Sequence, residues 1–311
     1  LIGFVPGETN TLTLTSGDEE HEFTITTPKS EADIDTQVEV VEGTSEEELT
    51  DGLFALLGHD KNYNSNIYLY DNDGVLREEF VLDSYRADRI IFDDDYMYYA
   101  YSKKGIVKVN DLGKIEEFYD LGKYSMHHDM VYDEDNNRFV ILVNEDGTDT
   151  IEDVIITVDL DTKEVEKIVD MKDLLPEFYL NAVKPEGKNT YGGYELDWIH
   201  LNSLSLIGDD MVLSSRELST IIYISNAYTE PSVKYLLTDE SVTEDTSYGD
   251  LLYEKVGDFV SQAGQHSITY YTDDDLEDGE YYLYMFNNNY QGARTRPNFD
   301  WSNYPGTGTY N

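Results

Sequence analysis

The chain has 311 residues, enough for one large domain or two ordinary ones, and its 65 acidic and 21 basic residues give a formal net charge of −44. A polyanion of this kind repels nucleic acids and anionic membrane surfaces, which counts against both as partners. Cysteine is absent, so a disulfide framework and a thiolate metal site are excluded.

The first patterned segment is a predicted β-hairpin. Residues 10–15 (NTLTLT) and 22–27 (EFTITT) alternate apolar and polar side chains, and an acidic turn separates them. Residues 28–50 are polar and acidic, and we expect a linker or an edge segment there. The chain begins at Leu1 without a methionine or a signal peptide, so we interpret it as part of a longer precursor. No run of 18 apolar residues is present, so we expect no membrane insertion.

From residue 52 onward the chain repeats a unit of strand, acidic turn, strand, loop, strand, turn and strand. The units begin near residues 52, 89, 127, 198 and 265, and the fifth breaks into a loop after one hairpin. Four-stranded antiparallel units in series are typical of a β-propeller, so the sequence predicts an all-β fold. Helical sequence is sparse: we expect a turn or two at residues 171–180, where Pro176 interrupts, and a short helix at 248–260.

Two acidic segments resemble short calcium-binding loops, residues 71–74 (DNDG) and 133–136 (DEDN). Neither has the spacing of an EF-hand, and β-turns favour Asx and Gly residues of this kind. We therefore expect turns at these positions, and we interpret the acidic surface as a solvating one.

Three histidines open similar stretches of sequence: His128, His200 and His266. Each is expected at or just before the first strand of a unit, the strand that lines the axis of a propeller. Arg216 closes the second strand of the fourth unit, and hairpin pairing returns it to the side of His200. The sequence thus predicts that the three histidines and Arg216 meet at one mouth of the central channel. A half-buried strand histidine is the ordinary alternative, but three placements in register favour a shared functional site.

The composition of this cluster favours chemistry on an oxyanion. Three histidines suggest zinc, but Arg216 would oppose a divalent metal and favour sulfate or phosphate. A neutral imidazole can attack a phosphoryl or sulfuryl centre, and further histidines can move protons near neutral pH. The residues therefore predict transfer of a tetrahedral oxyanion group through a histidine intermediate.

The same residues resemble the bacterial aryl-sulfate sulfotransferase family. The matching stretches are residues 127–129 (HHD), 197–203 (DWIHLNS), 214–216 (SSR) and 264–266 (GQH), and their order and approximate spacing also match. The N-terminal GFVPGETNTLTLT resembles the end of the small β-sandwich domain of that family. The resemblance implies a sandwich end and linker in residues 1–48 and a catalytic six-bladed propeller in residues 49–311.

The resemblance also implies an activity and roles for individual residues. The activity is transfer of a sulfuryl group from a phenolic sulfate ester to a phenol, by a ping-pong route through a sulfohistidine and without a nucleotide donor. His266 matches the nucleophile, and His200 and Arg216 match the residues that hold the sulfuryl oxygens and assist proton transfer. His128 is assigned as the third histidine, with Asn202 and His127 as substrate-binding residues. The implied protein needs no metal or cofactor, is periplasmic or extracellular, and forms a homodimer.

Two features depart from the family pattern. The chain lacks the cysteines that form a disulfide near the site in some members. Only about five units are visible, so we expect the C-terminal closure of the propeller to be missing, with residues 287–311 as a loop before the closing strands.

Two other classes of function remain open at this stage. One is a non-catalytic propeller that binds an anionic glycan or a protein partner at the channel mouth. The other is a metal-dependent hydrolase on the same scaffold. Binding without turnover would indicate the first, and loss of activity on chelation would indicate the second.

Overall fold

The computed structural model describes residues 2–39, 41, 52–83, 86–93, 95–189, 192–257, 259–290, 295 and 300. These residues are almost purely β, which confirms the expected all-β class. The chain divides into two compact units, Leu1–Asp120 and Leu121–Asn311, and each is described by itself. Within the described part of the chain, no helix is long and apolar enough to cross a membrane. The domain boundary at residues 48/49 stays a prediction, and it lies with most of residues 40–51 outside the described residues.

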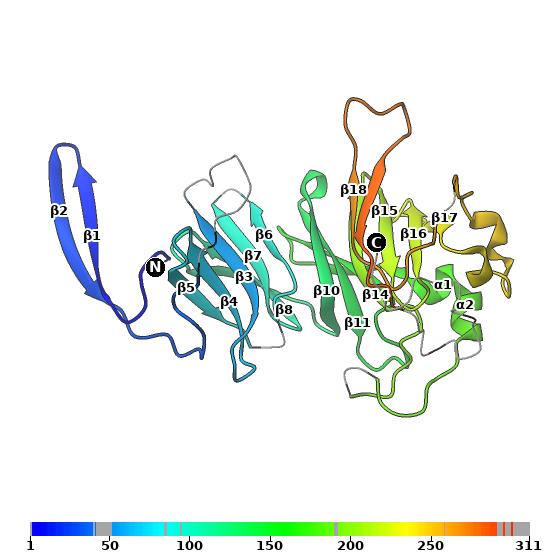
Figure 1. The fold of residues 1–311 in the computed structure, drawn as a ribbon, viewed down its shortest axis with the longest axis horizontal. Coiled ribbons are helices and arrows are strands. Elements are labelled where there is room, and N and C mark those ends of the chain that lie inside the picture. Colours follow the sequence, from blue (N-terminus) through cyan, green and yellow to red (C-terminus); the bar gives the residue numbers. More distant parts are fainter. Residues whose placement is uncertain are drawn as a thin grey trace. The chain divides into compact units, whose positions relative to one another are not determined.

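The first unit contains a hairpin and two antiparallel sheets (Figure 1). The hairpin joins β1 (Thr9–Ser16) to β2 (Glu19–Thr26), as the alternating pattern predicts. The three-stranded sheet consists of β3 (Leu53–His59), β4 (Ser65–Asp71) and β5 (Leu76–Val81). The four-stranded sheet consists of β6 (Ile90–Asp93), β7 (Tyr96–Ser102), β8 (Gly105–Asn110) and β9 (Ile115–Asp120). Apolar side chains of the two sheets, such as Ile67, Met97 and Val107, pack in one cluster.

The first repeat differs from the predicted four strands, because its sheet has three. Part of the segment expected as a linker or edge pairs at the edge of this sheet, beside the turn that leads into β5. Gln37 forms an isolated antiparallel bridge with Val75, and the Leu76 N–H donates to the Thr36 carbonyl. The start of β5 is therefore paired by residues that precede the sheet in the chain.

The second unit contains two four-stranded sheets and a final hairpin, each made of strands consecutive in the chain. The first sheet consists of β10 (Tyr124–Asp133), β11 (Arg138–Glu145), β12 (Val154–Asp159) and β13 (Val165–Asp170). The second sheet consists of β14 (Leu201–Ile207), β15 (Asp210–Ser215), β16 (Thr220–Ser225) and β17 (Ser232–Leu237). The hairpin joins β18 (His266–Tyr271) to β19 (Tyr282–Phe286). These are the predicted third, fourth and fifth repeats; the expected loop beyond residue 290 lies almost wholly outside the described residues.

Consecutive sheets of the second unit pack through faces of Val, Ile and Leu side chains. Leu142 and Ile155 of the first sheet share a buried cluster with Leu204 and Leu213 of the second. Another cluster joins the second sheet to Ile268 of β18. Full burial of such a side chain contributes about 1.5–3 kcal/mol, so this packing fixes how the sheets lie against each other. As a result β14 contacts both β10 and β18, and the first strands of the three sheets are neighbours.

The helices are short, as the sequence predicts, but one expectation is wrong. At residues 171–180 the chain forms α1 (Met171–Leu174) and α2 (Pro176–Asn181), with Pro176 at the start of α2, where a missing N–H costs nothing. Residues 248–260 were expected to be helical, but the described part contains only the 3-10 turn Ser247–Leu251. Tyr248, Leu251 and Leu252 pack on the core, but Val256 is 88% exposed, so the later part of the segment has little apolar burial to stabilise a helix. Two further 3-10 turns are Glu134–Asn136 and Glu240–Val242.

Candidate active site

His128 lies inside β10, at a β-bulge, and not at the start of the strand as the sequence suggested. Met126 pairs with Val143 and Met130 pairs with Ile141, so three residues of β10 stand opposite one residue of β11. His128 has a φ of +53°, a left-handed conformation that is uncommon for a residue other than glycine. A bulge bends the strand and redirects side chains, and such strained residues concentrate at functional sites. The sequence pattern did not indicate the regular segment Tyr124–Met126 that precedes the bulge in β10.

The first strands of the next two sheets carry similar irregularities at their histidines. His200 immediately precedes β14, has a φ of +52°, and is followed by a register shift between Leu201 and Ser203. His266 is the first residue of β18, and its neighbour Ser267 has a φ of +58° within a register shift. Three successive first strands therefore interrupt their ladders where they present a histidine.

These interruptions bring four imidazole rings together. The centroid of the His128 ring lies 4.9 Å from that of His200, 5.7 Å from that of His266 and 5.2 Å from that of His127. His127 and His200 are buried, whereas His266 is partly exposed. The structure thus places the predicted histidines in one cluster, while their chemical roles stay predictions.

Arg216 lies beside His200, as hairpin pairing predicts. The Arg216 backbone N–H donates to the His200 carbonyl at 3.0 Å. Asp197 links the two side chains, because its Oδ2 lies 2.8 Å from His200 Nδ1 and 3.5 Å from Arg216 Nη2. A second carboxylate, Glu217, lies 2.9 Å from Arg216 Nη2. Arg216 Nε is buried and has no hydrogen-bond partner among the described residues.

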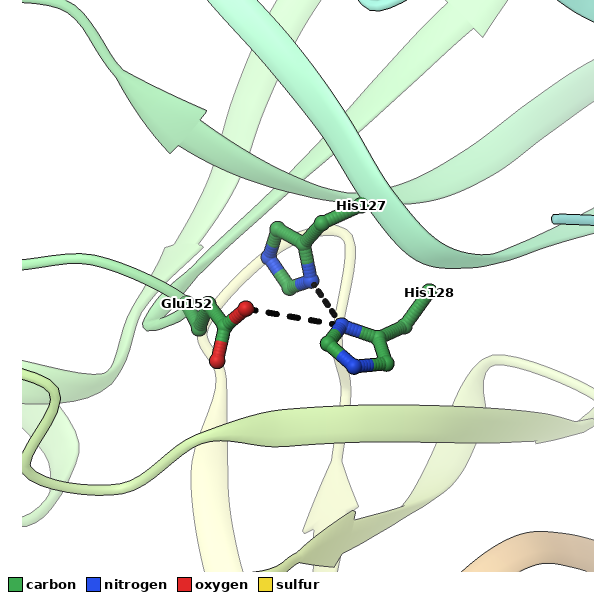
Figure 2. Close-up of side chains that lie close together, drawn as sticks. All are labelled: His127, His128 and Glu152. Atoms are coloured by element: carbon green, nitrogen blue, oxygen red, sulfur yellow. Dashed lines mark hydrogen bonds and ion pairs between the residues drawn. The ribbon is translucent and has the colours of Figure 1, made fainter. Parts of the chain in front are cut away.

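Glu152 is a fully buried carboxylate at the centre of the cluster. It lies in the loop between β11 and β12 and is 0% exposed. Figure 2 shows its carboxylate beside the His128 ring, where Glu152 Oε1 lies 3.5 Å from His128 Nδ1. Its other oxygen, Oε2, contacts His200 Nδ1. One carboxylate therefore faces the same ring nitrogen of two histidines.

The carboxylates fix the charge of His200. Burial by itself would lower the pKa of His200, but the charges and hydrogen bonds of Glu152 and Asp197 outweigh it and raise the pKa to about 9. Burial, together with the nearby charge of His200, lowers the pKa of His127 to about 3. Burial and the charge of Asp197 raise the pKa of Glu217. At neutral pH the site therefore holds a charged His200 and a neutral His127.

Asn202 lies on β14 with its amide turned toward the segment before β18. Its Nδ2 donates to the Gln265 carbonyl at 2.8 Å, and its Oδ1 is buried without a hydrogen-bond partner in the described part of the chain. The Gln265 amide in turn donates to Ser214 Oγ and to the carbonyls of Ser215 and Thr220. In this structure Asn202 supports the backbone that leads into His266, and its predicted contact with substrate stays a prediction.

Among the described residues, two sets of side chains have the composition of a metal site: His127 with His128 and Glu152, and Glu152 with Asp197 and His200. Within each set, one ligand atom per residue lies within 4.8 Å of the others. Both sets depend on Glu152, and a protonated His200 has no lone pair to offer a metal. The expectation of a metal-free site stays a prediction that chelation can test.

The two calcium-like segments form turns in the structure. Asp71 accepts hydrogen bonds from the N–H groups of Asp73 and Val75 and from Arg77 Nε. Asp133 likewise pairs with Asn136 and Arg138. The carboxylates of Asp71 and Asp133 thus stabilise the turns that they begin, which gives a structural reason for an aspartate at these positions.

Sequence reasoning missed the three carboxylates of the site. Asp197 stands three residues before His200 and Glu217 follows Arg216 directly, so their spacing from the predicted residues was a usable signal. Glu152 had none, because it lies 24 residues after His128 in a chain with 65 acidic residues.

The chain was compared with models of protein families and with curated proteins. The family model of arylsulfotransferases matches residues 38–310. None of the curated proteins matches the chain. The family match includes the clustered residues His128, His200, Arg216 and His266, and it spans most of the chain. The chain therefore belongs to the arylsulfotransferase family, which places its activity broadly among the aryl sulfotransferases.

Proposed function

We propose that the protein moves a sulfuryl group from a phenolic sulfate ester to a phenol, through a sulfohistidine at His266 and without a nucleotide donor. The observation that carries this proposal is the convergence of His128, His200 and His266 from three consecutive sheets. Arg216, joined to His200 through Asp197, adds a permanent positive charge to the cluster. Imidazole and guanidinium groups in this arrangement suit a tetrahedral oxyanion.

His266 is the proposed nucleophile, because it is partly exposed whereas His200 is buried and charged. The Ser267 N–H donates to His266 Nδ1 at 2.8 Å, and Ser267 Oγ lies 3.2 Å from the same atom. Because Nδ1 accepts this hydrogen bond, the neutral ring carries its proton on Nε2 in this conformation. Attack by Nε2 requires the other tautomer, in which the proton lies on Nδ1 and the Ser267 hydroxyl replaces the Ser267 N–H as its hydrogen-bond partner. The sulfur then forms a bond to Nε2 while its bond to the phenolic oxygen breaks.

His200 is the proposed acid in this first step. A pKa of about 9 lies close to that of a phenol, about 10, so its imidazolium can protonate the departing phenolate at little cost. In the second step the neutral His200 removes the proton of the acceptor phenol, which takes the sulfuryl group from His266. Arg216 Nε, a buried donor, is available for a sulfuryl oxygen in both steps.

The carboxylates of the site would repel an anionic substrate, but the positions of their contacts limit this repulsion. Asp197 and Glu152 contact His200 at Nδ1, and Asp197 and Glu217 contact Arg216 at Nη2. These contacts leave His200 Nε2 and Arg216 Nε for an anionic ligand. The carboxylates keep the two cations charged while the sulfuryl group binds to their other donors.

We extend the proposal to the assembly and the surroundings of the site. The antiparallel sheets, with their first strands adjacent in the second unit, support assignment as blades of a six-bladed propeller. The Tyr290 ring lies 5.6 Å from the Arg216 guanidinium and supports a role in the phenol pocket. Family membership supports a homodimer in the periplasm or outside the cell.

A donor–acceptor assay tests this function. The purified protein is incubated with 4-nitrophenyl sulfate, alone and with phenol, and the products and the enzyme are analysed by mass spectrometry. We expect phenyl sulfate with phenol present, and a peptide carrying sulfated His266 with the donor alone. His266→Ala should lose both, while His21→Ala, an exposed histidine of the β1–β2 hairpin, should keep both. Binding of the donor without turnover would reject this function in favour of a non-catalytic propeller.

A further inference from the structure

We infer that Glu152 is a shared positioning residue, which contacts the Nδ1 atoms of His128 and His200 with its two carboxylate oxygens and directs the other nitrogen of each ring toward the reacting group. This inference rests on the proposed function for its catalytic consequence. Its structural content, the tautomer of His128 and the charge of His200, can be measured without any turnover.

The backbone holds Glu152 firmly enough for this task. The Glu152 N–H donates to Asn144 Oδ1 at 2.6 Å, and the Glu152 carbonyl accepts from the Leu201 N–H at 3.0 Å. Its φ is +61°, a conformation that is unfavourable for a side-chain-bearing residue and persists only where the surroundings impose it. Asn144 belongs to β11 and Leu201 to β14, so Glu152 is tied to two consecutive sheets.

The hydrogen-bonding chemistry then determines which nitrogen of each ring carries a proton. An ionised carboxylate only accepts hydrogen bonds, so a ring nitrogen that faces it is favoured as N–H. His128 Nδ1 faces Glu152 Oε1 and, at 3.0 Å, His127 Nδ1, and both can accept its proton. The Nε2 atom of His128 is turned away from Glu152 and keeps the lone pair (Figure 2). With its proton on Nδ1, His128 presents an unprotonated Nε2, which can accept a hydrogen bond from the reacting group.

The same carboxylate has the opposite effect on His200. His200 Nδ1 faces two carboxylates, Glu152 Oε2 and Asp197 Oδ2, and the ring is 3% exposed. Among the described residues, Arg216 and Glu217 are further charged groups beside it. The neutral His127 and the His128 ring, 4.9 Å away between centroids, are its other titratable neighbours. Two negative partners in a buried setting hold the imidazolium form, so His200 presents Nε2 as a donor. One carboxylate therefore gives the site a hydrogen-bond donor, His200 Nε2, and an acceptor, His128 Nε2, from two chemically identical side chains.

The neighbouring residue provides a matched control. Asp153 is also buried, at 1% exposure, but it accepts from Trp198 Nε1 at 2.9 Å and lies 3.9 Å from Lys172 Nζ. Its contacts serve packing between the first two sheets of the unit. An isosteric amide at either position removes one buried negative charge, but only Glu152→Gln changes what the histidines face.

The experiment compares Glu152→Gln, Glu152→Asp and Asp153→Asn with the unchanged protein. Imidazole nitrogens are labelled with 15N, and His128 and His200 signals are assigned by their loss in single variants. In the unchanged protein at pH 7 we expect His200 as imidazolium and His128 as the Nδ1–H tautomer. In Glu152→Gln, His200 should lose its proton at a lower pH than in the unchanged protein, and both neutral tautomers of His128 should be populated. Asp153→Asn should change neither signal.

Kinetics provide the second readout. For the first half-reaction we expect Glu152→Gln to lower kcat by about 10- to 100-fold, taking as a guide the range seen when the hydrogen-bond partner of a metal-binding histidine is removed. The pH above which kcat falls should be lower in Glu152→Gln than in the unchanged protein. Glu152→Asp keeps the carboxylate charge and should recover part of the lost kcat. Unchanged 15N signals and pH profile in Glu152→Gln, with only a lower Tm, would overturn the inference. If the unchanged protein transfers no sulfuryl group, the proposed function fails, and the 15N signals still decide the role of Glu152.

Discussion

The Nδ1 atoms of two consecutive histidines, His127 and His128, lie 3.0 Å apart. Neighbouring residues of a regular strand point to opposite faces of the sheet, so the bulge in β10 and the φ of +53° at His128 are what bring the rings together. At this distance one of the two nitrogens donates a hydrogen bond and the other accepts it.

His127 predicts an acid-dependent loss of stability. Its pKa of about 3 in the folded state lies below its ordinary value of 6.5, so between these limits the unfolded chain binds a proton that the folded chain excludes. The free energy of unfolding should therefore fall as pH decreases below about 6.5. From pH 7 to pH 5 the free energy of unfolding, measured by urea denaturation, should fall in both proteins. We expect the fall in His127→Phe to be about 1–2 kcal/mol smaller than in the unchanged protein. Parallel pH curves for the two proteins would contradict the neutral state of His127.

His200 predicts the reverse dependence at alkaline pH. Its folded-state pKa is raised above 6.5 to about 9, so its stabilising contribution is complete below pH 6.5 and is lost as pH rises through 9. From pH 7 to pH 10 the free energy of unfolding, measured by chemical denaturation, should fall by about 2–3 kcal/mol more in the unchanged protein than in His200→Asn. Activity should fall over the same range, because the acid of the first step is deprotonated. An activity that rises steadily to pH 10 would argue that His200 acts as a neutral group.

Arg216 predicts a loss of transition-state binding that a lysine does not repair. Its guanidinium contacts Asp197 and Glu217 through Nη2 and leaves Nε for a ligand, a geometry that one ammonium group cannot reproduce. We expect Arg216→Ala to lower kcat/KM by about 10²–10³, the effect of removing one donor to a developing oxyanion, and Arg216→Lys to recover little. Arg138→Ala is the control, because Arg138 pairs with Asp133 at the β10–β11 turn and should leave kcat/KM unchanged. Equal losses in the two alanine variants would indicate a structural effect.

Chelation should leave the transfer reaction intact. The candidate ligand sets both depend on Glu152, whose oxygens face the Nδ1 atoms of His128 and His200. We expect protein dialysed against EDTA, and shown to be metal-free by elemental analysis, to keep its rate with 4-nitrophenyl sulfate and phenol. A loss on dialysis that zinc restores would support the metal-dependent hydrolase reading.

The repeated sheets could be predicted because strand patterns are local. Alternation and acidic turns identify β10 through β19, and the pairing of β14 with β15 returns Arg216 to His200. The first repeat has three strands, and Gln37 bridges Val75 beside the outer one, a contact that no local pattern indicates.

The sequence by itself determined the all-β class, the order of the repeats and the identity of three histidines and an arginine at corresponding positions. Only the tertiary structure decided that His128 lies within a bulge and that Glu152 faces both His128 and His200. The physical reason is that strand periodicity acts between near neighbours, whereas the surroundings of a buried carboxylate are set by packing between sheets. Among 65 acidic residues, only burial distinguishes Glu152 from a solvated surface charge.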